Sequence, residues 1–280
     1  MRFSAVTCVL LVVLAAGARA DWKPGQGMAA SMAINLTLGK KITDDSSYGF
    51  HDTCYLGAFL QPGRNSWITT ELEGGTSYIF AGAVASTCDL DIIVEDSSGR
   101  AVASDTKNDN IPVVRFAPRV SGTYTIRLSL YSGDAGYFCG MVLLRDGGWN
   151  LPAENLAQSA KQMLQRCSEV ATQVPVRFHD EEGEWAVVGH VYREGETALF
   201  TDLRMGTGRR FLVTGADRHS RDTDLLFGED GGGVLSSDVL ADNHPLLQFR
   251  TQRSQRYRME VRNSNSGGAT IIMTGLLAND

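Results

Sequence analysis

Eight aspartates form the chemically most suggestive pattern in this 280-residue sequence. They fall into two groups of four, each spanning a short apolar segment and the loop after it, about 133 residues apart. The eight are Asp89, Asp91, Asp105, Asp109, Asp222, Asp224, Asp238 and Asp242. Calcium takes about six to eight oxygen ligands, mainly carboxylates and carbonyls, so each group is a candidate calcium site. Aspartates also accept hydrogen bonds from backbone amides in turns, and this structural role is the favoured alternative.

Histidines are the second chemical candidates, because histidine is the usual general base near neutral pH. Phe50-His51-Asp52 reappears as Phe178-His179-Asp180, at a different spacing of about 128 residues, and a neighbouring aspartate could orient a base. The sequence contains no Gly-x-Ser-x-Gly nucleophile motif and no His-Glu-x-x-His metal motif. We therefore expect these histidines to have turn or capping roles, and we predict that the protein is not an enzyme.

The aspartates belong to a longer internal repeat. Matches at the same spacing follow one another in order: Asp89-Leu90-Asp91 with Asp222-Thr223-Asp224, Ser104-Asp105 with Ser237-Asp238, Asn110-Ile111-Pro112 with Asn243-His244-Pro245, and Tyr124 with Tyr257. Ordered matches at one spacing indicate two copies of one domain. A duplicated domain without a catalytic motif is typical of a binding or accessory module.

Short alternating segments between glycine-rich turns predict a mostly β fold. The candidate strands of the first copy are residues 55–61, 66–71, 77–83, 90–95, 101–104, 113–116, 122–130 and 136–145. Tyr124, Ile126 and Leu128 share one face, which is typical of a half-buried strand. Residues 28–38 and an apolar stripe that begins after Pro152 predict a helical segment before each copy. We predict two tandem jelly-roll-like β-sandwich domains.

The first 20 residues resemble a secretory signal peptide. Arg2 precedes an apolar run at residues 9–16, and Ala18-Arg19-Ala20 forms a cleavage site of the small-x-small type. We expect an exported protein, periplasmic or extracellular, with its first domain at residues 21–148 and a linker helix with the second domain at 149–280. No apolar stretch predicts a transmembrane segment. The formal charge of −6 disfavours nucleic acid as a partner.

Four cysteines remain after the predicted cleavage site, and export makes disulfides chemically reasonable. They are Cys54, Cys88, Cys139 and Cys167. The second copy lacks the counterparts of Cys88 and Cys139 together, which favours a bridge between these two and leaves Cys54 to pair with Cys167. Three pairings are possible from sequence alone. The absence of a Cys-x-x-Cys motif disfavours zinc.

Three further patterns have both a functional and a structural interpretation. Asn35-Leu36-Thr37 is a glycosylation sequon, which matters only in a host that modifies such sites. The tryptophans could stack on a ligand, although packing is the simpler explanation; they are Trp22, Trp67, Trp149 and Trp185. A basic stretch could contact an anionic polymer, but a solvated strand face is the default; it consists of Arg250, Arg253, Arg256, Arg258 and Arg262.

At the repeated residues the chain resembles the bacterial pre-peptidase C-terminal domain, a small secreted β-sandwich module. The motifs are Tyr78-Ile79-Phe80, Asp89-Leu90-Asp91, Gly99, Ser104-Asp105 and Gly122-Thr123-Tyr124. The resemblance covers residues 50–146 and, more loosely, 184–279, where Gln255-Arg256 replaces the Ser-Gly before the tyrosine. It implies a module that accompanies exported peptidases and other secreted enzymes. Some relatives bind calcium or extracellular polymers such as collagen.

These patterns together favour a secreted, non-catalytic binding or accessory protein. Its partner would be an extracellular or envelope protein or a polysaccharide, and calcium is the one cofactor that the sequence suggests. Two alternatives stay open. One is a secreted, peptidase-associated hydrolase with an unrecognised active site, and the other is a structural envelope protein without a small ligand.

Overall fold

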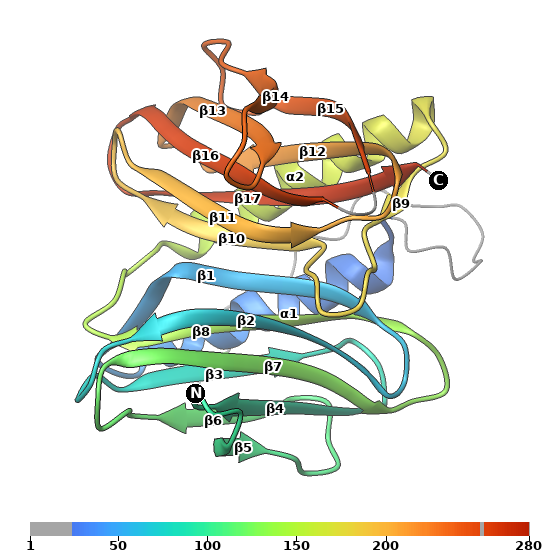
Figure 1. Ribbon diagram of the computed structural model, residues 1–280. Coiled ribbons are helices and arrows are strands. Elements are labelled where there is room, and N and C mark those ends of the chain that lie inside the picture. The colour runs from blue at the N-terminus through green and yellow to red at the C-terminus, as the bar shows by residue number, and fades with distance from the viewer. Residues whose placement is uncertain (1–23, 253–254, 280) are drawn as a thin grey trace.

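The computed structural model describes residues 24–252 and 255–279 (Figure 1). The predicted signal peptide, Trp22 and Arg253 lie outside these residues. Helix α1 spans Gln26–Asp44 and helix α2 spans Ala153–Gln173. Strands β1 to β8 are Tyr48–Leu60, Arg64–Leu72, Tyr78–Ala83, Asp89–Glu95, Ala101–Asp105, Val113–Phe116, Gly122–Ser132 and Tyr137–Asp146. Strands β9 to β17 are Arg177–Phe178, Val187–Tyr192, Thr197–Arg204, Gly208–Ala216, Ser220–Glu229, Val234–Asp238, Leu246–Thr251, Arg256–Ser266 and Thr270–Asn279. The predicted mostly β fold with two helical segments is confirmed.

The two halves of the chain have the same strand order. In the first half, β1-β8-β3-β6 lie side by side, and a separate four-stranded sheet has the order β2-β7-β4-β5. In the second half the corresponding orders are β10-β17-β12-β15 and β11-β16-β13-β14. Each strand therefore has a counterpart with the same neighbours, in agreement with the sequence repeat. The short β9 pairs with β17 beside this pattern.

The halves are joined by pairing of β1 with β10, which makes the rear strands of both halves one continuous antiparallel sheet. Leu56 of β1 lies opposite Val188 of β10. On their other sides, Leu56 pairs with Met141 and Val188 pairs with Thr274, two positions separated by the repeat spacing. Leu56 and Val188 are therefore equivalent residues that face each other, so the halves are related by an approximate twofold axis at this pair.

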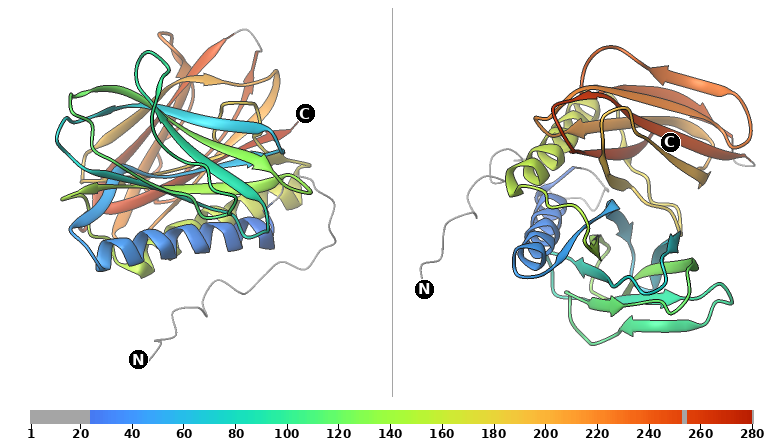
Figure 2. Two further views of the ribbon diagram at one scale, coloured as in Figure 1. Left: turned by 90° about the horizontal axis from the view of Figure 1, so that it is seen from below. Right: turned by 90° about the vertical axis from the view of Figure 1, so that its left-hand side faces the viewer.

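Three apolar cores hold the layers together. One lies between the two sheets of the first half and includes Leu90, Ile92 and Leu128, and a second fills the corresponding space in the second half. The third lies between the shared sheet and the helices. Both helices cover the same outer face of that sheet (Figure 2). Burying apolar side chains on both faces makes the shared sheet the structural centre of the molecule.

Close helix packing depends on glycines in the sheet. A Cβ atom on Gly215 would lie 2.2 Å from the backbone nitrogen of Met163, so only glycine allows α2 to approach β12 this closely. In the first half, Asn35 of α1 is fully buried and donates hydrogen bonds to the carbonyls of Ala83 (2.8 Å) and Ser31 (3.0 Å). The glycosylation sequon is therefore inaccessible in the folded protein.

The repeated tyrosines have similar positions. Tyr124 donates from its hydroxyl to the Val120 carbonyl (3.2 Å), and Tyr257 donates to the Gln252 carbonyl (3.2 Å). Each bond connects the start of a strand to the turn before it. Tyr257 is fully buried and stacks on Phe227, whereas Tyr124 is half-buried. The repeat preserves the hydrogen bond more closely than the burial.

The expected disulfides are not present, and the predicted pairings are corrected here. Cys54, Cys88, Cys139 and Cys167 are all free thiols in the described part of the chain. Cys54 packs beside Gly189 of β10, whereas Cys167 packs beside Gly275 of β17, so the two thiols occupy different parts of the helix-facing core. Burial raises the pKa of Cys88 to about 11 and that of Cys139 well above its usual value, which disfavours the reactive thiolates.

Candidate functional site

Four of the eight repeated aspartates fasten loops in both halves. Asp105 accepts a hydrogen bond from the backbone nitrogen of Val113 (3.0 Å), and Asp238 accepts one from Leu246 (3.0 Å). Asp109 and Asp242 each accept a bond of 2.9 Å from the backbone nitrogen two residues later. These are the contacts of turn-forming aspartates, and they are the same in the two halves.

The other four aspartates lie on the adjoining strands. Burial raises the pKa of Asp91, and the neighbouring carboxylates of Asp89, Asp105 and Asp109 add to the shift. Burial also raises the pKa of Asp222, with Asp224 and Asp242 contributing. The described residues contain no group of three or more His, Cys, Asp or Glu side chains arranged to hold a metal ion. The assignment of calcium to these aspartates stays a prediction.

We expect Asp105→Ala and Asp238→Ala each to lower the free energy of unfolding by about 1–2 kcal/mol, because each leaves a backbone amide without its acceptor. Urea denaturation in a buffer with calcium and in a buffer with a chelator measures this loss. The same comparison tests whether calcium stabilises the protein. A loss that is the same in both buffers supports the loop-fastening role. A stabilisation by calcium that disappears in the variants would instead support the metal site.

The repeated His-Asp pairs do not form a catalytic unit. Asp52 accepts a hydrogen bond from the Trp149 indole nitrogen (2.6 Å), and Asp180 pairs with Arg177. His51 contacts the Thr53 carbonyl through Nδ1 (3.2 Å), and burial lowers its pKa. Neither aspartate hydrogen-bonds to the histidine beside it, so the arrangement that would orient a general base is missing from the described residues.

The different spacing of the two Phe-His-Asp segments nevertheless has a structural meaning. Phe50 pairs with Leu144 and Phe178 pairs with Leu277, two partners separated by the repeat spacing. The two phenylalanines are therefore equivalent, and the repeat resumes at β10 after extra residues. The extra residues fall within a loop, residues 180–186, which we call the seam loop because it lies at the junction of the halves.

The seam loop is attached to β2 by several contacts. Ser66 donates from its hydroxyl to the Glu184 carbonyl (2.7 Å), and the Trp185 indole donates to the Trp67 carbonyl (2.7 Å). Arg204 of β11 pairs with the Glu184 carboxylate (3.0 Å) and lies over the Trp67 ring, 5.4 Å from its centroid. Burial raises the pKa of Glu184 to about 6, although Arg204 opposes the shift. Trp67 and Trp185 thus have packing roles.

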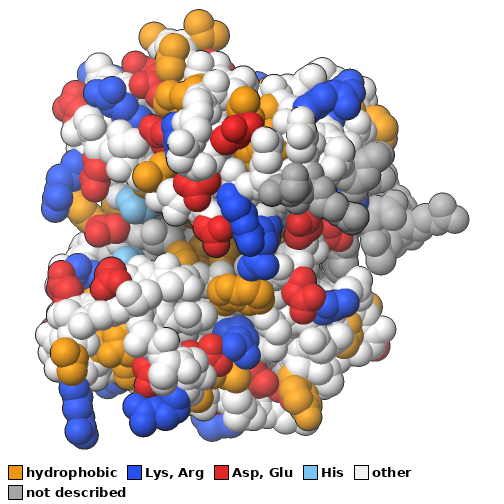
Figure 3. All heavy atoms as spheres, viewed as in Figure 1, with side chains coloured by type: hydrophobic (Ala, Val, Ile, Leu, Met, Phe, Trp, Pro, Cys, Tyr) orange, Lys and Arg blue, Asp and Glu red, His pale blue; other side chains and the backbone are white. Residues whose placement is uncertain are grey.

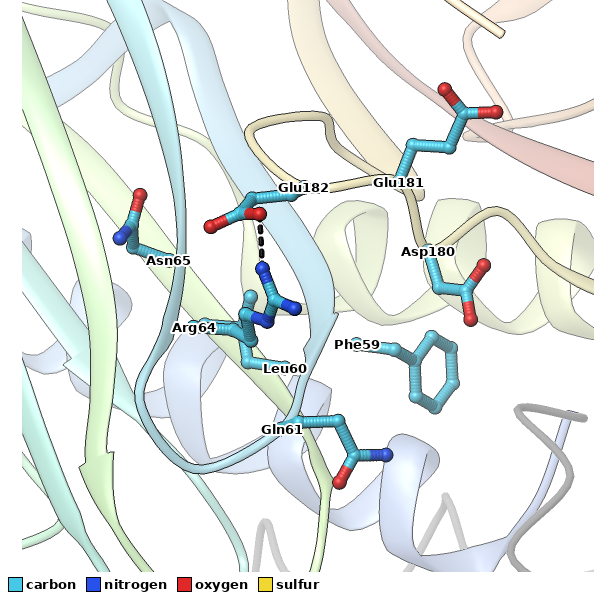
Figure 4. A pocket seen from close by; sticks show the side chains of 8 residues that line it. All are labelled: Phe59, Leu60, Gln61, Arg64, Asn65, Asp180, Glu181 and Glu182. Atoms are coloured by element: carbon cyan, nitrogen blue, oxygen red, sulfur yellow. Dashed lines mark hydrogen bonds and ion pairs between the residues drawn. The ribbon is translucent and has the colours of Figure 1, made fainter. Parts of the chain in front are cut away.

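A pocket of about 300 Å³ opens beside this loop, and we call it the seam pocket (Figure 4). Its lining consists of Phe59, Leu60, Gln61, Arg64, Asn65, Asp180, Glu181 and Glu182. Arg64 and Glu182 form an ion pair across it, and Glu181 accepts a hydrogen bond from the Gly206 backbone nitrogen. No side-chain hydrogen bond of Gln61 or Asn65 is present within the described residues.

The seam pocket lies on a face where charged side chains gather. A hollow crosses the middle of this face, with acidic, basic and histidine side chains around it (Figure 3). Three carboxylates and one guanidinium line the pocket, so its own charge is negative. Of the lining residues, only Asp180 belongs to a motif that the sequence analysis singled out, the Phe178-His179-Asp180 segment, so the pocket itself was not identified. The change of repeat spacing between Phe178 and β10 was the available signal.

No family model matches the chain, and no curated protein matches it significantly. Among solved structures, the tandem CBM51 modules of a family 98 glycoside hydrolase from Streptococcus pneumoniae are 11% identical, with a TM-score of 0.24 and coverage of 80% of this chain and 84% of that chain. The tandem CBM22 modules of a Paenibacillus barcinonensis protein are 9% identical (TM-score 0.23; 80% and 93% covered). A Penaeus vannamei nodavirus structure is 10% identical (TM-score 0.24; 82% and 97% covered). These similarities are distant.

Neither described helix is both long and apolar enough to cross a membrane.

Proposed function

We propose that the chain is an exported, non-catalytic binding protein that holds one unit of a neutral carbohydrate in the seam pocket. The observation that carries this proposal is the lining of the pocket, which combines an aromatic ring, two amides and several carboxylates. Gln61 and Asn65 are the amides, and no described side chain hydrogen-bonds to them. Binding sites of this size typically combine apolar surface with a few polar groups that orient the ligand.

The chemistry of a sugar matches this lining. Hydroxyl groups both donate and accept, so they can donate to carboxylates and exchange hydrogen bonds with the amides of Gln61 and Asn65. The Phe59 ring, which packs against Phe138 and Phe178, is the aromatic side chain of the lining. An anionic sugar is disfavoured, because the carboxylates of Asp180, Glu181 and Glu182 outnumber the single lining arginine.

The rest of the proposal follows from the sequence. The signal-like residues 1–20 support export, and the strand orders of the two halves support two jelly-roll-type domains at 21–148 and 149–280. We infer that the protein is an accessory component that accompanies an exported enzyme, as the resemblance to the pre-peptidase C-terminal domain implies. The hydrolase and structural alternatives have no specific support in the geometry of the described residues.

We expect Gln61→Ala and Asn65→Ala each to weaken carbohydrate binding about fivefold to tenfold, the effect of losing one hydrogen bond. Titration calorimetry with a panel of neutral and acidic oligosaccharides measures this, and Gln165→Ala on the exposed face of α2 is the matched control. Binding of a neutral sugar that falls in both pocket variants but not in the control supports the proposal. Absence of neutral-sugar binding, or equal affinity in all proteins, contradicts it.

A further inference from the structure

The seam loop extends the front sheet of the first half as an additional strand segment. Gly183 forms an isolated parallel bridge with Ser66 of β2. Its backbone nitrogen donates to the Asn65 carbonyl (3.2 Å), and its carbonyl accepts from the Trp67 nitrogen (3.5 Å). Trp67 packs on this glycine so closely that a Cβ at position 183 would lie 2.3 Å from the indole ring. The chain therefore covers the outer edge of β2 with its own backbone.

The equivalent edge in the second half belongs to β11. Thr197 and Leu199 are the counterparts of Asn65 and Trp67, because their cross-strand partners in β16 and β7 are separated by the repeat spacing. Among the described residues, no segment outside the sheet bonds to the Thr197 carbonyl or the Leu199 nitrogen. The Leu199 side chain is 56% exposed. The edge that the first half covers is thus open in the second half.

The first half has no segment that could pair with the open edge of β11. The seam loop fits between Phe178 and Val187, whereas the equivalent positions Phe50 and Tyr55 are joined by a shorter connection. That shorter connection stays within β1 as a bulge in its pairing with β8. It therefore provides no extended segment to pair with β11. An open strand edge presents unpaired amides and carbonyls, which readily accept another extended chain.

We propose that the outer edge of β11 binds an extended peptide segment of a partner protein by strand addition, with a small residue opposite Leu199. The seam loop on β2 is the template within the same molecule, since it makes the same backbone contacts at the equivalent positions. Main-chain hydrogen bonds supply most of the affinity in this mode of recognition.

This partner differs from the carbohydrate of the seam pocket, and the two sites can be tested independently. The probe is a fluorescein-labelled octapeptide with the sequence of residues 179–186, His-Asp-Glu-Glu-Gly-Glu-Trp-Ala. Fluorescence anisotropy with the full chain should show saturable binding. Leu199→Lys should weaken it at least tenfold, because a lysine on an edge strand opposes strand pairing. Methylation of the glycine nitrogen in the peptide removes one backbone donor and should have a similar effect.

The matched control is Val234→Lys, which places the same charge on β14, the opposite edge of the same sheet, at a side chain that is 50% exposed. It should bind the peptide as the unmodified protein does. Gln61→Ala should also keep peptide binding, and Leu199→Lys should keep carbohydrate binding, so failure of one proposal is distinguishable from failure of the other. No peptide binding, or equal binding by Leu199→Lys or by the methylated peptide, overturns the inference. Size-exclusion chromatography tests whether the protein self-associates. If it does, and if the associated form no longer binds the peptide, the β11 edge pairs with a second copy of the chain, and this result also overturns the inference.

Discussion

Asp217→Ala is expected to lower the free energy of unfolding by about 4 kcal/mol or more, because it removes the acceptor of several buried donors. The Asp217 carboxylate is fully buried. It accepts from Asn155 Nδ2 (2.9 Å) and the His219 nitrogen (2.9 Å), and also from Thr270 Oγ1 (2.6 Å) and the Ile271 nitrogen (3.1 Å). One side chain thus connects α2 to the β12–β13 turn and to β17.

The measurement is urea denaturation followed by circular dichroism, with Asp45→Ala as the control. Asp45 forms an exposed ion pair with Lys41 (2.6 Å), and loss of such a solvent-screened pair changes stability little. If both variants lose the same small amount, Asp217 does not hold these elements together. The repeat offers a further comparison, because Ala85 occupies the corresponding position in the first half and cannot accept these bonds.

The second large effect is acid sensitivity. Burial lowers the pKa of His179 to about 4 and that of His190 to about 4, against an ordinary value of 6.5. Arg210 adds to the shift of His179 and His51 to that of His190, while Asp180 and Asp52 oppose them. Because the unfolded chain binds these protons first, the stability contributed by each neutral histidine is complete above pH 6.5. It is lost as pH falls from 6.5 through 4.

At pH 5 each histidine is expected to cost about 2 kcal/mol relative to pH 7.5. Glu184 acts in the opposite direction: its raised pKa of about 6 favours the fold at low pH, and that contribution is lost as pH rises through 6. We therefore expect a net loss of about 3 kcal/mol between pH 7.5 and pH 5. Chemical denaturation at both pH values measures this loss.

For each variant, the quantity to compare is the change in the free energy of unfolding between pH 7.5 and pH 5, not its stability at one pH. His179→Gln and His190→Gln should each reduce the loss at pH 5 by about 2 kcal/mol. His244→Gln is the control, because the His244 side chain is exposed. Equal losses in the unmodified protein and in all three variants would show that these buried histidines do not determine acid sensitivity.

Much of the fold could be predicted from local sequence patterns. The alternation of Tyr124, Ile126 and Leu128 places them on one face of β7, and residues 113–116 form β6 as predicted. The stripe after Pro152 forms α2. These features depend on side-chain periodicity, which a single segment contains in full. The pairing of β1 with β10 depends instead on two distant segments that are apolar on both faces, and no local pattern specifies which strand each will join.

The candidate site was less predictable for a related reason. Turn-forming and metal-binding aspartates have the same sequence pattern, and only the hydrogen bonds of Asp105 and Asp238 distinguish a fastening role. The cysteine prediction was wrong because absence of both cysteines from one copy shows only that they changed together, not that their sulfur atoms meet. The seam pocket requires the β1–β2 turn and the seam loop to meet in space, which the sequence does not record.

The facing of Leu56 and Val188 has a consequence for the origin of the molecule. An interface in which a residue lies opposite its own counterpart is what two identical subunits form when they associate around a twofold axis. The present chain has the arrangement of such a homodimer with its subunits fused into one polypeptide. Fusion releases the two subunits from the requirement of identity, and this explains how the second copy could acquire a loop that covers the β2 edge of the first copy while its own β11 edge stayed exposed.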